Sequence, residues 1–73
     1  MSILNIHIDE TLDNQGVRSL REALATIPHV INVELNASLP HDLLVEYEGH
    51  FNMPTIILDK LNHQGLHVDV LGG

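Results

Sequence analysis

The sequence predicts an α+β fold whose elements follow in the order strand–helix–strand–strand–helix–strand, written βαββαβ. Four short segments alternate apolar and polar residues with a period of two, which is typical of half-buried strands. Two longer segments place apolar residues three and four positions apart, as on one side of a helix. An antiparallel sheet with one face on a core and the other in water shows such alternation on every strand. With 73 residues, the chain is expected to form a single domain over residues 1–73.

The first half of the chain predicts a strand, a helix and a second strand. These elements are expected at residues 3–8, 13–27 and 30–35. Asp13 is a typical N-cap residue for the helix, and Pro28 is expected to end it because proline cannot continue a helix. The side chains expected to point into the core are Leu4, Ile6, Ile8, Val17, Leu20, Leu24, Ile27, Ile31, Val33 and Leu35.

The second half is expected to contain a turn, a strand, a helix and a strand at residues 36–41, 42–48, 53–63 and 66–71. Asn52 is the expected N-cap of this helix, Pro54 lies in its first turn, and Gly65 is expected to end it. Leu44 and Val30 would be apolar residues on the otherwise polar face of the sheet. The side chains expected to point inward are Leu43, Val45, Tyr47, Ile57, Leu58, Leu61, Leu66, Val68 and Val70, with Met53 or Pro54 beside them.

The element order is that of a ferredoxin-like two-layer sandwich. Because crossover connections are right-handed, both helices are expected on one face of an antiparallel sheet with the strand order 4-1-3-2. The other face of the sheet is then left open to solvent. Side chains that alternate with the core residues are expected to line this open face.

The composition excludes several functional classes. The net charge is −7 with only three basic residues, which argues against binding to nucleic acid or to anionic membranes. The absence of cysteine excludes disulfides, thiolate metal sites and thiol catalysis. No apolar run is long enough to span a membrane and no signal peptide is apparent, so a cytoplasmic protein is expected. An acidic surface suits cations or a basic-surfaced protein partner.

The run from Asp13 to Leu35, DNQGVRSLREALATIPHVINVEL, resembles the first half of a heavy-metal-associated domain. This family includes copper chaperones, periplasmic mercury-binding proteins and the N-terminal modules of metal-pumping ATPases. In the family pattern the helix opens with Cys-x-x-Cys and the following turn reads Pro-Gly-Val. Counting back from Pro28, Asp13 and Gly16 occupy the two cysteine positions. The resemblance implies a metal-related role and a partner such as a metal-transporting ATPase.

Neither Asp13 nor Gly16 is a predicted metal ligand. Soft cations such as Cu(I) prefer thiolates, whereas a carboxylate is a hard ligand and glycine has no side chain. The predicted topology instead brings histidines and carboxylates together on the open face. The candidate ligands are His7, His67, Asp42 and, at the rim, Asp9. Imidazole with carboxylate suits Zn(II), Ni(II), Co(II) or Cu(II).

The alternative interpretation of this cluster is a solvated sheet face with weak cross-strand hydrogen bonds. The other four histidines are expected in turns, in loops or at a helix end: His29, His41, His50 and His63.

Three functions are consistent with these residues. The first is a small non-enzymatic domain that binds or transports a metal through histidine and carboxylate ligands. The second is a degenerate family member that acts as a protein-interaction or regulatory module. The third is a small-molecule sensing domain of ACT type, which shares the βαββαβ order and commonly dimerises. An enzyme is disfavoured because a two-layer fold of this size has little room for a pocket. The expected state is a monomer or a weak dimer.

Overall fold

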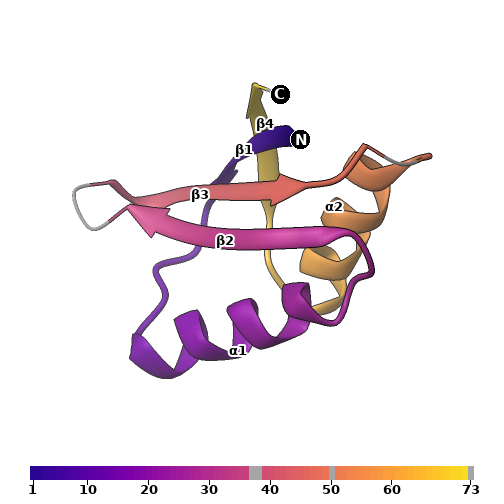
Figure 1. Ribbon diagram of the computed structural model, residues 1–73. Coiled ribbons are helices and arrows are strands. Elements are labelled where there is room, and N and C mark those ends of the chain that lie inside the picture. Colours follow the sequence, from indigo (N-terminus) through magenta and orange to yellow (C-terminus); the bar gives the residue numbers. More distant parts are fainter. Residues whose placement is uncertain (37–38, 50, 73) are drawn as a thin grey trace.

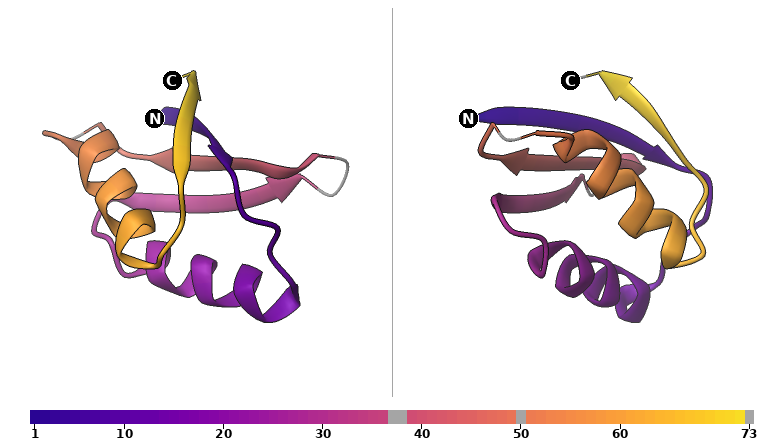
Figure 2. Two further views of the ribbon diagram at one scale, coloured as in Figure 1. Left: turned by 180° about the vertical axis from the view of Figure 1, so that it is seen from behind. Right: turned by 90° about the vertical axis from the view of Figure 1, so that its right-hand side faces the viewer.

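A computed structural model of the protein describes residues 1–36, 39–49 and 51–72 (Figure 1). The elements are β1 (Ser2–Ile8), α1 (Asn14–Ala25), β2 (Val30–Asn36), β3 (Leu39–Tyr47), α2 (Met53–His63) and β4 (Val68–Gly72). The strands form one antiparallel sheet in the order β2-β3-β1-β4. Both helices lie on the same side of this sheet (Figures 1 and 2). The predicted ferredoxin-like sandwich, with strand order 4-1-3-2 read from the opposite edge, is therefore confirmed.

The core lies between the sheet and the two helices. The central strands β1 and β3 contribute their predicted inward side chains, which are nearly inaccessible to solvent. The predicted apolar side of α1 and that of α2 cover them. Among the described residues, the buried core consists of Leu4, Ile6, Ile8, Leu20, Leu24, Ile27, Leu43, Val45, Tyr47, Met53, Ile57 and Leu61. The period-two and helical patterns of the sequence therefore predicted these positions correctly.

Strand β2 differs from the prediction at its start. Ile31 was expected in the core, but this prediction is wrong because the side chain is 50% exposed. Val30, expected on the open face, instead packs against the core. Val30 pairs with Tyr47 whereas Asn32 pairs with Glu46, so Ile31 is an extra residue in a β-bulge. A bulge shifts the alternation by one residue, which exchanges the two faces. Beyond the bulge, Val33 and Leu35 pack against the core as predicted.

Strand β4 also departs from the expected pattern. Val70 was predicted to be inward, but it is 47% exposed, although it pairs with the fully buried Ile6. Because β4 is an edge strand, no further strand covers its outer side. Leu66 and Val68 pack against the core as expected. A second irregularity in the pairing leaves Leu71 as an extra residue beside β1.

The helix ends follow most of the predicted signals. Asp13 caps α1 as predicted, and the helix ends at Ala25, two residues earlier than expected. Asn52 occupies the N-cap position of α2 as predicted, although its side chain makes no capping hydrogen bond. Its backbone has a left-handed φ of 60°, which differs from the extended geometry of a capping residue. Gly65 ends α2 with a φ of 82°, a conformation that favours glycine.

Candidate functional site

The open face of the sheet is organised in rows of side chains that cross the strands. His7 on β1 pairs with Asp42 on β3 and with Asp69 on β4. Directly paired residues of an antiparallel sheet point to the same face, so an imidazole lies between two carboxylates in this row. Asp9 follows two positions after His7 along the chain. The antiparallel pairing thus places side chains of three strands around His7.

Both nitrogens of the His7 ring have a carboxylate nearby. The distance from Nδ1 to Asp42 Oδ1 is 3.6 Å, and that from Nε2 to Asp9 Oδ1 is also 3.6 Å. These distances are longer than a hydrogen bond. All three side chains are partly or largely exposed to solvent. The structure therefore brings three of the four predicted ligands together, with a gap on each side of the imidazole.

The fourth predicted ligand, His67, contacts a different residue. Its backbone N–H donates to Glu10 Oε1 at 2.8 Å, and its ring Nδ1 hydrogen bonds to Glu10 Oε2. The backbone N–H of Asp9 in turn donates to the carbonyl of His67 at 2.9 Å. Glu10 was not among the predicted site residues. Its contact with His67 joins the end of β1 to the segment before β4, and no local sequence pattern signals a pair 57 residues apart.

The contact between Glu10 and His67 changes the pKa of both groups. Hydrogen bonds from the ring and then the backbone of His67 lower the pKa of Glu10 from its ordinary value of 4.5. The hydrogen bond to Glu10 and then its negative charge raise the pKa of His67 from its ordinary value of 6.5. The carboxyl contribution to stability is lost as the pH falls through the lowered pKa, and the imidazole contribution is lost as the pH rises through the raised pKa. The pair thus stabilises the fold most between pH 4.5 and 6.5.

Glu10→Gln is expected to bring the pKa of His67 back toward its ordinary value of 6.5, because the amide carries no charge. The measurement is an NMR titration of the imidazole carbon-bound protons. Glu22→Gln on the exposed side of α1 is the matched control and should leave the His67 titration unchanged. An unchanged His67 midpoint in Glu10→Gln would show that the contact does not form in solution.

His41 belongs to the sheet and was wrongly predicted as a turn residue. Asn36 pairs with Leu39, so the connection between β2 and β3 is shorter than expected and β3 begins earlier. The Nδ1 atom of His41 lies 2.8 Å from the carbonyl oxygen of Ile8 and 3.2 Å from that of Glu10. Carbonyls only accept hydrogen bonds, so Nδ1 carries the proton. The His41 ring centre is 5.7 Å from that of His7.

Comparison with known proteins identifies solved structures that share this architecture. No family model matches the chain, and no curated protein sequence matches it. A structure from work on crosstalk between Cu(I) and Zn(II) homeostasis is 25% identical with a TM-score of 0.82, covering 97% of this chain and 100% of that one. The N-terminal domain of PacS from Synechocystis PCC6803 is 24% identical with a TM-score of 0.82, covering 99% and 100%. A copper binding domain from HMA7, a P-type ATPase, is 15% identical with a TM-score of 0.84, covering 99% and 96%.

The chain has the heavy-metal-associated fold. Its resemblance to these domains extends over nearly the whole chain, and it contains no cysteine. The turn after α1 shows a second departure from the family pattern, because His29 stands where the family has glycine. His29 has a left-handed φ of 75°, a conformation that glycine adopts without strain. The turn thus has a backbone conformation that suits glycine, although histidine stands there.

The N-terminus of α1 is where heavy-metal-associated domains carry their cysteines. Here Asp13 Oδ1 accepts a hydrogen bond of 2.7 Å from the backbone N–H of Gly16. A side chain at Gly16 would place its Cβ 3.2 Å from Asp13 Oδ1 and 3.3 Å from the Leu12 side chain. The carboxylate therefore satisfies a helix N–H group, and the two positions pack closely against each other.

Two further findings describe the parts of the chain that the structure covers. Within residues 1–36, 39–49 and 51–72, no three or more histidine, aspartate or glutamate side chains are grouped so that they could hold a metal ion. Neither described helix has the length and apolar character needed to cross a membrane. The cluster around His7 thus provides donor pairs rather than a closed metal cage.

Proposed function

We propose that this heavy-metal-associated domain is a non-enzymatic binding domain that holds a divalent cation through imidazole and carboxylate groups. The observation that carries this proposal is the position of His7 between Asp9 and Asp42. Two ligands of one tetrahedral cation, each about 2.1 Å from the metal, lie about 3.4 Å apart. Each nitrogen–oxygen distance of 3.6 Å is close to this spacing. Because the two ring nitrogens of His7 point in different directions, a cation would be held by one of these pairs, not by both.

The donor types limit which cations fit. Nitrogen from imidazole with oxygen from carboxylate suits Zn(II), Ni(II), Co(II) or Cu(II). His67 remains a proposed ligand, but only its Nε2 atom is available because Nδ1 is bonded to Glu10. A cation held by one or two protein donors would keep open coordination positions.

A metal-transporting ATPase or another protein with a basic surface is the proposed partner. The support is the likeness to a domain of a P-type ATPase and the net charge of −7. We also propose a cytoplasmic location and a monomer or weak dimer, as expected from the sequence.

The test is an NMR titration of the untagged domain with Zn(II), Ni(II), Co(II) and Cu(II). We expect saturable shifts at His7, Asp42 and their strand neighbours, and their loss in His7→Ala. His63→Ala is the matched control, because His63 lies at the end of α2 on the other layer and should not alter the response. A titration that is unchanged in His7→Ala, or that needs millimolar metal, would contradict the proposal.

A second candidate function is protein contact without a metal. The observation that favours it is the N-terminus of α1, where Asp13 caps the helix at a position that holds a cysteine in related domains. The same titration separates the two functions, since a domain retained only for protein contact would show no saturable metal response at His7.

A further inference from the structure

The basic and acidic residues of the domain are distributed unequally between its two layers. All three basic residues lie on the helices, with Arg18 and Arg21 on α1 and Lys60 on α2. No strand therefore carries a lysine or arginine. The pairing of the strands places four carboxylates on the open face, those of Glu34, Asp42, Glu46 and Asp69. The open face of the sheet is thus acidic without compensating cations of its own.

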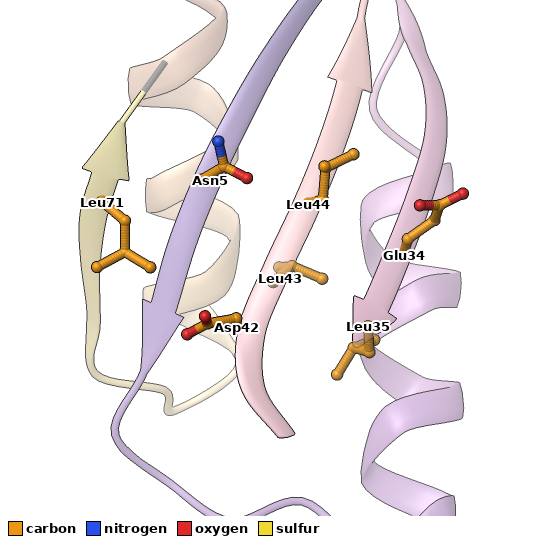
Figure 3. A pocket seen from close by; sticks show the side chains of 7 residues that line it. All are labelled: Asn5, Glu34, Leu35, Asp42, Leu43, Leu44 and Leu71. Carbon is orange, nitrogen blue, oxygen red and sulfur yellow. The ribbon is translucent and has the colours of Figure 1, made fainter. Parts of the chain in front are cut away.

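The same face contains an open hollow of about 470 Å³. Leu44 lines it and pairs with Asn5 on one side and Glu34 on the other. Figure 3 shows the Leu71 side chain at the β4 edge of this hollow and that of Asp42 extending from β3 toward β1. The hollow therefore combines leucine residues from three strands with the carboxylates of Glu34 and Asp42.

We propose that this hollow is a docking surface for a protein segment that presents arginine or lysine beside an aliphatic side chain. The aliphatic group would contact Leu44 and Leu71, which removes apolar surface from water. The cation would reach Glu34 or Asp42, and arginine suits this role because it binds a carboxylate through two parallel hydrogen bonds. Charge complementarity then selects basic partners and excludes acidic ones.

A second copy of this chain is a poorer occupant than a basic partner. Two open faces brought together would oppose carboxylates with carboxylates, because neither face has a lysine or arginine. Contact between the helices of one copy and the sheet of another is heterologous and does not close into a dimer. His7 does not line the hollow, but Asp42 belongs both to the hollow and to the proposed metal site.

The test uses the full chain in the presence of a chelator and three short synthetic peptides. In the first peptide arginine alternates with leucine, in the second arginine alternates with serine, and in the third glutamate alternates with leucine. We expect the arginine–leucine peptide to shift the amide signals of Asn5, Glu34 and Leu44 saturably. The other two peptides should bind more weakly or not at all.

Variants of the chain locate the contact. Glu34→Gln is expected to raise the dissociation constant of the arginine–leucine peptide by up to about fivefold, the range for an exposed ion pair. Leu44→Thr should also weaken binding of this peptide because it removes the apolar contact. Threonine is suited to strands, so the sheet should be retained. Glu22→Gln on α1 should leave peptide binding unchanged, and the chelator separates docking from metal binding. Equal binding of the arginine–serine peptide, or shifts confined to the helices, would overturn the proposal. Concentration-dependent shifts of the same amides without peptide would assign the face to self-association instead.

Discussion

The double substitution Asp13→Cys and Gly16→Cys is expected to give the domain a soft-metal site that binds Cu(I). Heavy-metal-associated domains place their cysteines at these two positions, at the N-terminus of the first helix. There the helix dipole and the free N–H groups lower thiol pKa values and favour the thiolates that bind soft cations. The backbone of this chain matches those domains overall, with TM-scores of 0.82 to 0.84, so we expect a similar geometry at the N-terminus of α1. Competition with a colorimetric Cu(I) chelator measures the gain.

Both cysteines are needed for this result. The single variants Asp13→Cys and Gly16→Cys serve as controls, because one thiolate does not form a two-coordinate Cu(I) site. Loss of the Asp13 cap should lower the free energy of unfolding by about 1 kcal/mol. Removing the Asp13 carboxylate also relieves the 3.2 Å contact that a Cβ at position 16 would otherwise make. If the folded double variant bound Cu(I) no better than the single variants, the equivalence of these positions with the family's cysteines would be wrong.

The substitution Ile57→Ala is expected to lower the free energy of unfolding by about 2–5 kcal/mol. Ile57 is fully buried in α2 and packs in the core between the helices and the sheet. Small domains have a total stability of about 5–15 kcal/mol, so this loss would remove a large share of it. Urea denaturation followed by circular dichroism measures the change.

Ile56→Ala provides a matched control for this prediction. Ile56 is the neighbouring residue on the same helix, but its side chain is 41% exposed. The substitution should change stability by less than about 1 kcal/mol, and the higher helix propensity of alanine offsets part of any loss. Equal destabilisation by the two variants would show that α2 is rotated about its axis relative to the structure described above.

The sequence alone was sufficient for most of the fold because nearly every element obeys its own periodicity. The alternation in β1 and β3 predicted their buried side chains, and these strands occupy the centre of the sheet, where both neighbours enforce the register. Capping by Asp13 and termination at Gly65 depend only on local backbone chemistry. Agreement between such local signals and the overall topology made the fold predictable.

The errors concern features that depend on neighbouring strands. Ile31 and Val30 lie on the opposite faces from those predicted because β2 has a bulge where it pairs with β3. No residue type in β2 is specific to a bulge. Val70 keeps the alternation of a buried strand but lies on an edge strand, so its exposure follows from strand order rather than from its own segment. All three residues are apolar, and composition alone does not reveal which apolar residues of an edge strand are covered.

The candidate site was predictable only where it follows from strand pairing. The closeness of His7 to Asp42 and Asp9 follows from the topology and from spacing along β1. The contact of His67 with Glu10 depends on the path of the chain after β1. No periodicity or motif in the sequence predicts this path. The orientation of His41 toward two carbonyls also requires the three-dimensional positions of their peptide groups.

The confinement of all three basic residues to the helices makes the molecule an electric dipole. A dipole turns in an external field, so the domain should approach any positively charged body with its sheet foremost before contact is made. On an anion-exchange matrix it would be held by the sheet, leaving the helices and the N-terminus of α1 directed toward the solution. This orienting torque weakens as salt shortens the screening length, which is about 8 Å at physiological ionic strength. Long-range electrostatic forces therefore orient the domain before it contacts a charged partner. Added salt weakens these forces and makes the orientation less uniform.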